Sequence, residues 1–253
     1  PPLVPREGWH VMHLFYHIDH GQWQMLDESE KREAKTGFTE LVQEIRTTSD
    51  TQLLTFTVAT PKADLGFMLL TPDLQLANTF EKRLTLSLGV EVLTPAYSYL
   101  SQTERSEYTT SGEQYAEETL KQEEGLSEDS LEYASKLKDF EERMEHYLQH
   151  RLYPVLPDWP AICFYPMSKR RHGNDNWYAL DYEERRILMK GHATTGRKYS
   201  GRILQLITGS TGLDDAEWGV TLLPRTQSTS KQSSTRCDLT LSPCAMENLE
   251  ISI

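Results

Sequence analysis

The first hundred residues alternate between two hydrophobic periods. Trp9 to Tyr16 is short, apolar and β-like in character, which predicts a strand. From Glu30 to Arg46 they recur every three to four positions, which predicts a helix. Two short β runs, Gln52 to Ala59 and Leu65 to Leu70, are separated by a Pro-Lys-Ala-Asp break that is typical of a hairpin.

A second helix and a closing strand complete this first unit. Thr71-Pro-Asp73 offers an N-cap and an early proline, so a helix is predicted to begin there. Val90 to Leu100 is predicted to be a strand. The order strand, helix, strand, strand, helix, strand is the ferredoxin-like pattern, and we assign it to residues 1–104.

Residues 105–157 differ in composition from the first unit. Ser106 to Ser130 is polar and acidic, which predicts a linker or an exposed loop. A long amphipathic helix follows and ends near Pro154. Its buried stripe is predicted to comprise Leu137, Phe140, Met144 and Leu148.

A second ferredoxin-like half is predicted over residues 158–225. Ala161 to Met167 has the apolar character of a strand, and Asp181 to about Ala193 has the period of a helix. Asp181 and Glu184 have the spacing of a capping box at the start of this helix.

Two further strands are predicted in this half, Gly201 to Thr208 and Trp218 to Leu223, joined by the turn-rich Gly212-Leu-Asp-Asp215. A complete second half would add one more helix and one more strand, and residues 226–253 show the pattern of neither. The predicted fold class is therefore α+β with an incomplete C-terminal half.

Charge, hydropathy and cysteine content limit the classes of function. The chain has 253 residues and a net charge of −12, which argues against nucleic acid as a partner. No apolar run approaches the ~18 residues of a membrane span. Pro1 to Gly8 lacks a signal segment, so we expect a cytoplasmic protein. The three cysteines have no zinc-site spacing, and Cys163 is predicted to be a small core residue.

Polar side chains in the second half are predicted to converge on one apolar pocket. Because side chains alternate along a strand, Tyr165 and Met167 share one face, and Lys169 joins them if the chain stays extended. His192 lies one turn after Leu188 on the same helix face, so it points inward. A neutral imidazole is the commonest protein ligand of haem iron.

Gln205 lies between Ile203 and Ile207 on one strand face, so its amide is predicted to be buried. A buried amide without a partner costs about 1–3 kcal/mol, so a polar group must meet it. A backbone group and a bound ligand would each satisfy this amide.

Basic residues gather near this pocket although the protein is acidic. They are Arg151, Lys169, Arg170 and Arg171. Charge-assisted pairs with carboxylates are strong, and arginine binds a carboxylate in a fork. The cluster therefore favours an acidic ligand.

Each of these residues also has a purely structural alternative. His192 is compatible with a hydrogen-bonded core histidine, and Trp177 with ordinary core packing. Tyr165 suits any amphipathic strand. Arg151 suits a helix C-terminus, where the dipole favours a cation, and residues 169–171 suit a solvated basic turn.

Several segments, taken in order, resemble the chlorite dismutase superfamily and most closely its coproheme decarboxylase branch, which acts in haem biosynthesis. The similarity is dense from about Glu145 to Thr221 and weaker from Trp9 to Ser101. The segments that carry it are His150–Pro154, Tyr165–Lys169, Asn176–Tyr178, Glu183–Arg186, Met189–His192, Gly196–Tyr199, Thr208–Ser210, Gly212–Asp215 and Glu217–Thr221.

The resemblance implies a dimeric α+β barrel made of two ferredoxin-like halves, assembled as a homopentamer. It implies that two propionates of iron coproporphyrin III (coproheme) are removed as carbon dioxide to give haem b, with hydrogen peroxide as the oxidant. A transient contact with the ferrochelatase is also implied.

The resemblance also assigns roles to residues of this sequence. His192 matches the proximal iron ligand, and Tyr165 matches the residue that forms a tyrosyl radical. Lys169 and Arg151 match residues that hold propionates.

The remaining matched residues define the pocket itself. Met167 and Trp177 match residues that line the porphyrin pocket, and Gln205 matches the residue facing the open side of the iron. Chlorite-degrading members are expected to carry an arginine at that position, so the neutral amide disfavours chlorite chemistry. A haem-binding or haem-sensing protein of the same fold, without chemistry, and a chlorite dismutase-like haem enzyme are the alternatives.

Residues 226–253 depart from the family pattern. Synonymous codons can be chosen for Ser234 to Ile253 so that the register one base earlier reads as a family-like ending, beginning Val-Tyr-Glu-Met-Arg-Phe-Asp-Leu-Val-Ser. We therefore hypothesise a frameshift in the gene or its sequencing near Leu222 to Arg225, which reading the DNA through this stretch would test. With the printed tail, weak porphyrin binding and low activity are expected.

Overall fold

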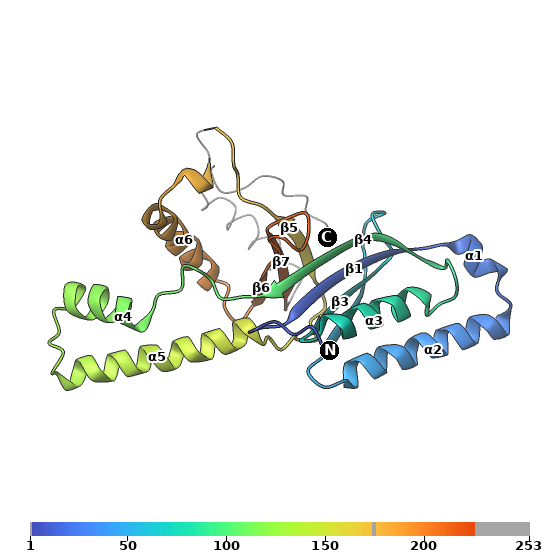
Figure 1. Ribbon diagram of the computed structural model, residues 1–253. Coiled ribbons are helices and arrows are strands. Elements are labelled where there is room, and N and C mark those ends of the chain that lie inside the picture. The colour runs from blue at the N-terminus through green and yellow to red at the C-terminus, as the bar shows by residue number, and fades with distance from the viewer. Residues whose placement is uncertain (1, 174–175, 226–253) are drawn as a thin grey trace. The chain divides into compact units, whose positions relative to one another are not determined.

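The computed structural model describes residues 2–173 and 176–225 of the chain (Figure 1). The chain divides into two compact units. The first comprises the residues up to Thr103 together with those from Leu156 onward, and the second comprises Glu104–Val155.

The predicted strand and helix order of the first half is confirmed, with a short extra helix, α1, after the first strand. The elements are β1 (His10–Ile18), α1 (His20–Met25), α2 (Glu28–Thr47), β2 (Gln52–Thr57), β3 (Leu65–Thr71), α3 (Leu74–Leu86) and β4 (Leu93–Thr103). Asp73 caps α3 as expected, because its carboxylate accepts a hydrogen bond from Gln75 N. The last strand begins three residues later than predicted, after a turn at Gly89.

The second half contributes three strands and two helical segments in the described residues. They are β5 (Cys163–Met167), η2 (Trp177–Ala179), α6 (Tyr182–Arg197), β6 (Ile203–Gly209) and β7 (Trp218–Pro224). The capping box of Asp181 and Glu184 is present at the start of α6. The predicted aberrant tail, residues 226–253, lies outside the described residues.

The seven strands found in the described residues form one antiparallel sheet in the order β2-β3-β1-β4-β6-β7-β5. The two halves meet at β4 and β6, where Gln102 pairs with Gly209 and Thr103 with Thr208. The mixed α+β class is therefore confirmed.

Two apolar cores lie on opposite faces of the first half of this sheet. Helices α2 and α3 run side by side along one face and bury Ile45, Phe67 and Leu84 against it (Figure 1). On the other face, Val11 of β1 packs with Leu206 of β6, although β4 lies between these strands.

His13 of β1 also reaches across the sheet. Its Nε2 lies 2.8 Å from Thr221 Oγ1 of β7, and its ring stacks on Phe164 of β5 at 3.8 Å. Since these strands are not neighbours in the sheet, the sheet curves around a shared interior. A closed barrel stays a prediction, because no ladder between β5 and β2 joins the described residues.

The second unit is more helical than predicted. It contains α4 (Gly112–Gln114), the π-helix η1 (Tyr115–Glu123) and α5 (Leu131–Leu152), so the prediction of a loop over Ser106 to Ser130 is wrong for residues 112–123. Ser111 caps the first turn, Leu120 is fully buried, and Tyr115 stacks on Phe140 at 4.0 Å. These few apolar contacts order a segment whose overall composition is polar.

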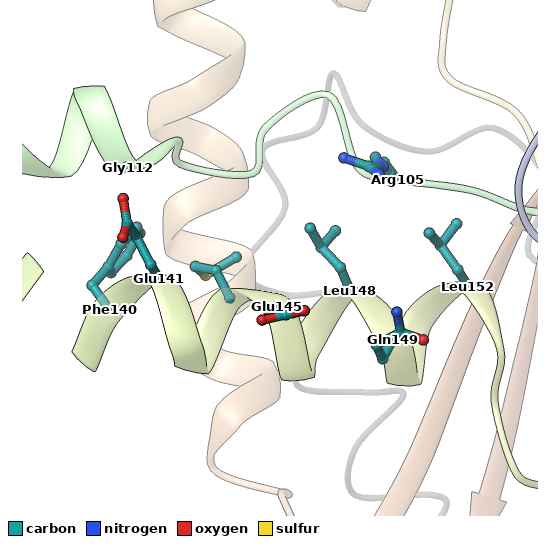
Figure 2. Close-up of a pocket in the computed structure, with 9 residues that line it drawn as sticks. Arg105, Gly112, Phe140, Glu141, Glu145, Leu148, Gln149 and Leu152 are labelled. Atoms are coloured by element: carbon teal, nitrogen blue, oxygen red, sulfur yellow. The ribbon is translucent and has the colours of Figure 1, made fainter. Parts of the chain in front are cut away.

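The predicted apolar stripe of α5 is only half-buried. It lines a groove of about 380 Å³ in the second unit (Figure 2). The residues of this groove are Arg105, Gly112, Phe140, Glu141, Met144, Glu145, Leu148, Gln149 and Leu152. Of the helix residues, Leu152 is the buried one.

Candidate functional site

One face of the second half-sheet carries three of the predicted site residues. Tyr165 and Met167 of β5 pack in one apolar cluster with Ile203 and Ile207 of β6. Gln205 projects from this same face, because it lies between the two isoleucines on the strand.

Strand register fixes how Tyr165 and Gln205 are related. Tyr165 pairs with Val220 of β7, and Val220 pairs with Ile207 of β6. Gln205 is one same-face position along β6 from Ile207. The side chains of Tyr165 and Gln205 therefore lie on one face of the sheet. Their strands, β5 and β6, are two strand spacings or about 10 Å apart.

Helix α6 covers this face at its C-terminal end. Tyr199, just after α6, is buried in the same cluster as Tyr165. A Cβ added at Gly196 would lie 3.8 Å from Gln205 Oε1, so the amide reaches α6. His192 lies one turn before Gly196 on the same side of the helix.

Gln205 is exposed, so the prediction that its amide is buried is wrong. The reason is local. Gly196 of α6 lies beside the amide, and it has no side chain that could cover it. Gln205 therefore presents a neutral hydrogen-bonding group at an open part of the sheet face.

His192 is half-buried and makes no hydrogen bond to another described residue, and its Nδ1 is fully covered. Burial lowers the pKa of the imidazole, and the nearby Lys169 lowers it further. Both effects favour the neutral ring, which is the form that binds a metal. A core histidine would be hydrogen-bonded to its neighbours, whereas His192 forms no such bond to the residues that the structure describes.

Lys169 and Trp177 lie together next to this helix. The Lys169 Nζ lies 4.4 Å from the centre of the Trp177 ring, and both side chains are buried. Burial lowers the pKa of Lys169 to about 8, and the charge of Glu217 opposes that shift. The charge of Lys169 lowers the pKa of His192, so the ammonium lies near the imidazole.

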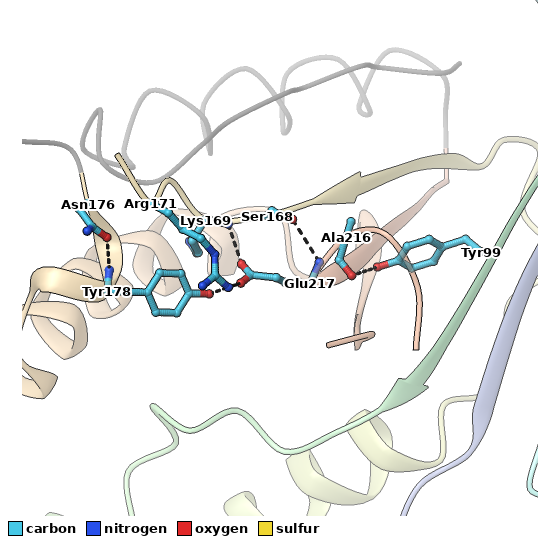
Figure 3. A network of polar contacts seen from close by, with 8 residues as sticks. All are labelled: Tyr99, Ser168, Lys169, Arg171, Asn176, Tyr178, Ala216 and Glu217. Atoms are coloured by element: carbon cyan, nitrogen blue, oxygen red, sulfur yellow. Dashed lines mark hydrogen bonds and ion pairs between the residues drawn. The ribbon is translucent and has the colours of Figure 1, made fainter. Parts of the chain in front are cut away.

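Glu217 is a buried acidic residue that sequence reasoning missed. Its carboxylate accepts hydrogen bonds from Lys169 N at 2.8 Å, from the Arg171 guanidinium and from the Tyr178 hydroxyl (Figure 3). One feature of the sequence could have indicated it. Glu217 is a carboxylate directly before the apolar strand β7, in a segment already matched to the family.

The predicted concentration of positive charge is partly neutralised. Arg171 forms an ion pair with Glu217 and is not free to bind a ligand carboxylate. Arg151 belongs to the second unit, where its Nε donates to Glu104 O at 2.7 Å. Its role as a propionate ligand stays a prediction from resemblance.

The residues present fit an iron porphyrin. Such an iron already has four ring nitrogens, so one unpaired neutral imidazole is a sufficient protein ligand. His192 meets this need, and no group of three metal-ligating side chains occurs in the described part of the chain. The apolar cluster that contains Tyr165 and Met167 suits the macrocycle, and the Lys169 ammonium beside Trp177 suits a carboxylate arm.

Similar known proteins point to one family. A family model described as chlorite dismutase matches residues 31–231. The chain is also similar to a haem-binding protein from Thermus thermophilus. That protein has 32% sequence identity and a TM-score of 0.75, over 97% of this chain and 89% of the other.

Two more distant structures share the fold. A mutant chlorite dismutase from Candidatus Nitrospira defluvii is 18% identical, with a TM-score of 0.67 over 94% of this chain and 86% of the other. A putative chlorite dismutase is 15% identical, with a TM-score of 0.68 over 96% and 92%.

The described helices include none that is both long and apolar enough to cross a membrane. The family model spans most of the chain, and the 32% identity extends over nearly all of it. This chain therefore belongs to the chlorite dismutase family.

Proposed function

We propose that this chain catalyses the hydrogen peroxide-dependent oxidative decarboxylation of iron coproporphyrin III to haem b, as a step of haem biosynthesis. The observation that carries this proposal is the grouping, around one half-sheet, of a buried phenol, a buried ammonium and an imidazole that forms no hydrogen bond to another described residue. Tyr165, Lys169 and His192 supply these groups from β5, the segment after it and α6.

The substrate would be held by groups of three kinds. His192 would bind the iron, and the side chains of Met167 and Trp177 would pack on the macrocycle. The Lys169 ammonium would pair with a propionate, because a charge-assisted hydrogen bond to a carboxylate is strong in a water-poor site. The porphyrin would thus be oriented with one acidic arm at Lys169.

The overall reaction balances for each propionate removed. One propionic acid side chain and one hydrogen peroxide give one vinyl group, one carbon dioxide and two water molecules. When bound, the iron of the porphyrin would be the centre that reacts with hydrogen peroxide. Tyr165 would give up an electron and its phenolic proton, and the phenoxyl oxygen would then take a hydrogen atom from the propionate. Loss of one further electron and of the carboxylate as carbon dioxide completes the vinyl group.

Gln205 supports this chemistry over chlorite degradation. The amide is neutral, and it stands on the same sheet face as Tyr165. A neutral donor admits peroxide without the electrostatic attraction that a cation would give to an oxyanion.

The test is to add ferric coproporphyrin III and hydrogen peroxide to the purified chain and follow the products by mass spectrometry. Stepwise loss of two formic acid equivalents is the expected result. The variant Tyr165→Phe removes the hydroxyl and keeps the ring, so we expect decarboxylation to fall at least 100-fold while porphyrin affinity changes less than about threefold.

Two other results would contradict the proposal. The Thermus thermophilus relative is described as a haem-binding protein, so a chain that binds porphyrin and leaves it intact would instead be a binding or sensing module. Equal turnover by the parent chain and Tyr165→Phe would remove the radical role of Tyr165.

A further inference from the structure

We infer that Glu217 is a positioning residue of this site: its carboxylate fixes the backbone of Lys169 so that the ammonium extends over the Trp177 ring. The inference rests on the proposed function for its effect on substrate. Its structural part can be tested without any porphyrin.

The Glu217 carboxylate connects two segments that follow β5. One oxygen accepts from Lys169 N at 2.8 Å, and the other accepts from Arg171 and from the Tyr178 hydroxyl (Figure 3). Only 7% of Glu217 is exposed, so these bonds replace water almost completely. The carboxylate therefore holds the residues after β5 against the turn that carries Trp177.

The main chain around Glu217 is itself fixed to the sheet. Glu217 N donates to Met167 O at 3.1 Å, and Glu217 O accepts from Ser210 N at 2.7 Å. The preceding carbonyl, Ala216 O, accepts from the Tyr99 hydroxyl of β4 at 3.2 Å (Figure 3). The carboxylate thus has little freedom to move relative to the strands.

Ring contacts reinforce the same arrangement. The Arg171 guanidinium lies 4.2 Å from the centre of the Tyr178 ring, while both groups bond to Glu217. The Lys169 Nζ lies over the neighbouring Trp177 ring. The adjacent rings of Trp177 and Tyr178 therefore each contact one cation. The Glu217 carboxylate bonds to a residue of each cation–ring pair.

Glu217 leaves the Lys169 ammonium available to a ligand. It bonds the backbone N–H of Lys169, and no hydrogen bond from Nζ to another described residue is present. The negative charge still acts on the ammonium at a distance and favours its charged form against burial. The site therefore contains a charged donor that is positioned and still unoccupied by acceptors from the described part of the chain.

The first test needs no porphyrin. In Glu217→Gln the carboxylate charge is lost, and we expect an amine-reactive reagent to modify Lys169 about tenfold faster, as measured by peptide mass spectrometry. Glu217→Asp keeps the charge and should restore most of the protection. Glu183→Gln, which removes an exposed carboxylate paired with Arg186, is the matched control and should leave the Lys169 rate unchanged.

The second test measures binding of ferric coproporphyrin III by titration of its Soret band. For Glu217→Gln we expect Kd and KM to rise about tenfold while kcat falls less than threefold. The spectrum of the iron–imidazole complex should stay the same, because Glu217 does not bond His192.

Several outcomes separate this inference from the proposed function. If the parent chain binds no porphyrin, the function fails, and the labelling rates still decide the role of Glu217. If Glu217→Gln is labelled and binds like the parent, the inference is wrong. If Glu217→Gln does not fold, Arg171→Met and Tyr178→Phe take its place, and unchanged labelling in both folded variants would overturn the inference.

Discussion

At the scale of single residues, the most unusual side chain outside the site is His13. It is fully buried on β1, stacked on Phe164 and bonded to Thr221. Burial lowers the pKa of His13 to about 3 from its ordinary value of 6.5. The folded chain therefore keeps this imidazole neutral, while the unfolded chain protonates it below about pH 6.5.

His13 should make the protein sensitive to mild acid. Its contribution to the free energy of unfolding is fully present above pH 6.5 and decreases as pH falls toward 3, by up to about 1.4 kcal/mol per pH unit. His13→Gln keeps a hydrogen-bonding group and does not titrate. Between pH 6.5 and 4.5, the free energy of unfolding of this variant, measured with denaturant, should therefore depend less steeply on pH. The difference in slope should correspond to at most one proton. Identical slopes in the two proteins would contradict this account.

Lys169 predicts a second pH effect, on ligand affinity. With its pKa lowered to about 8, the side chain is charged below pH 8 and loses its charge as pH rises through that value. Affinity for ferric coproporphyrin III should therefore weaken above pH 8. Lys169→Arg stays charged throughout this range and should show no such step in a Soret titration at pH 7 to 9.5. A step that persists in the arginine variant would assign the titration to another group.

At the scale of elements, the contact between strands β4, β6 and β7 depends on a glycine. A Cβ at Gly219 would lie 2.8 Å from Tyr99 Cε1, 3.0 Å from Thr208 Oγ1 and 3.2 Å from the Phe164 ring. Tyr99 belongs to the first half and bonds Ala216 O, so this close approach helps to join the two halves. The absence of a side chain is what lets the rings pack there.

Gly219→Ala should therefore destabilise the fold by about 1–3 kcal/mol, because the added methyl group overpacks a rigid site. Gly37→Ala, in the middle of α2 with nothing within 4 Å of the new Cβ, is the matched control and should stabilise by about 0.5–1 kcal/mol. Denaturant unfolding of both variants provides the measurement. A neutral Gly219→Ala would show that Tyr99 can move away at little cost.

At the scale of the whole chain, the two halves of the first unit have corresponding strands with different pairing. β1 pairs with β3 on one side and β4 on the other. β5, its counterpart, pairs with β7 alone among the described strands. The repeat therefore predicts a further strand beside β5, at the edge that carries Tyr165.

Replacing residues 234–253 by the family-like ending should supply that strand. We expect the melting temperature to rise by at least about 5 °C, because a paired edge gains backbone hydrogen bonds, and porphyrin affinity to increase at least tenfold. Calorimetry and Soret titration of both chains would show this. Equal stability and affinity would mean that the printed tail already completes the site, and the frameshift hypothesis would lose its physical support.

Local periodicity was sufficient to predict most of the elements. The capping box at Asp181, the helix α6 and the shared face of Tyr165 and Met167 depend only on neighbours within a few residues, so the sequence determines them. The prediction of a loop after Ser106 was wrong because a few apolar contacts outweighed a polar composition. Composition averages over a segment, whereas folding depends on particular contacts.

The tertiary structure alone decided the partners of the buried titratable side chains. Glu217 meets Lys169 across 48 residues of sequence, and His13 meets Thr221 across 208. The exposure of Gln205 likewise follows from a glycine on a different element. Sequence periodicity fixes which face a side chain occupies, but the curvature of the sheet and the packing of α6 fix what lies opposite it.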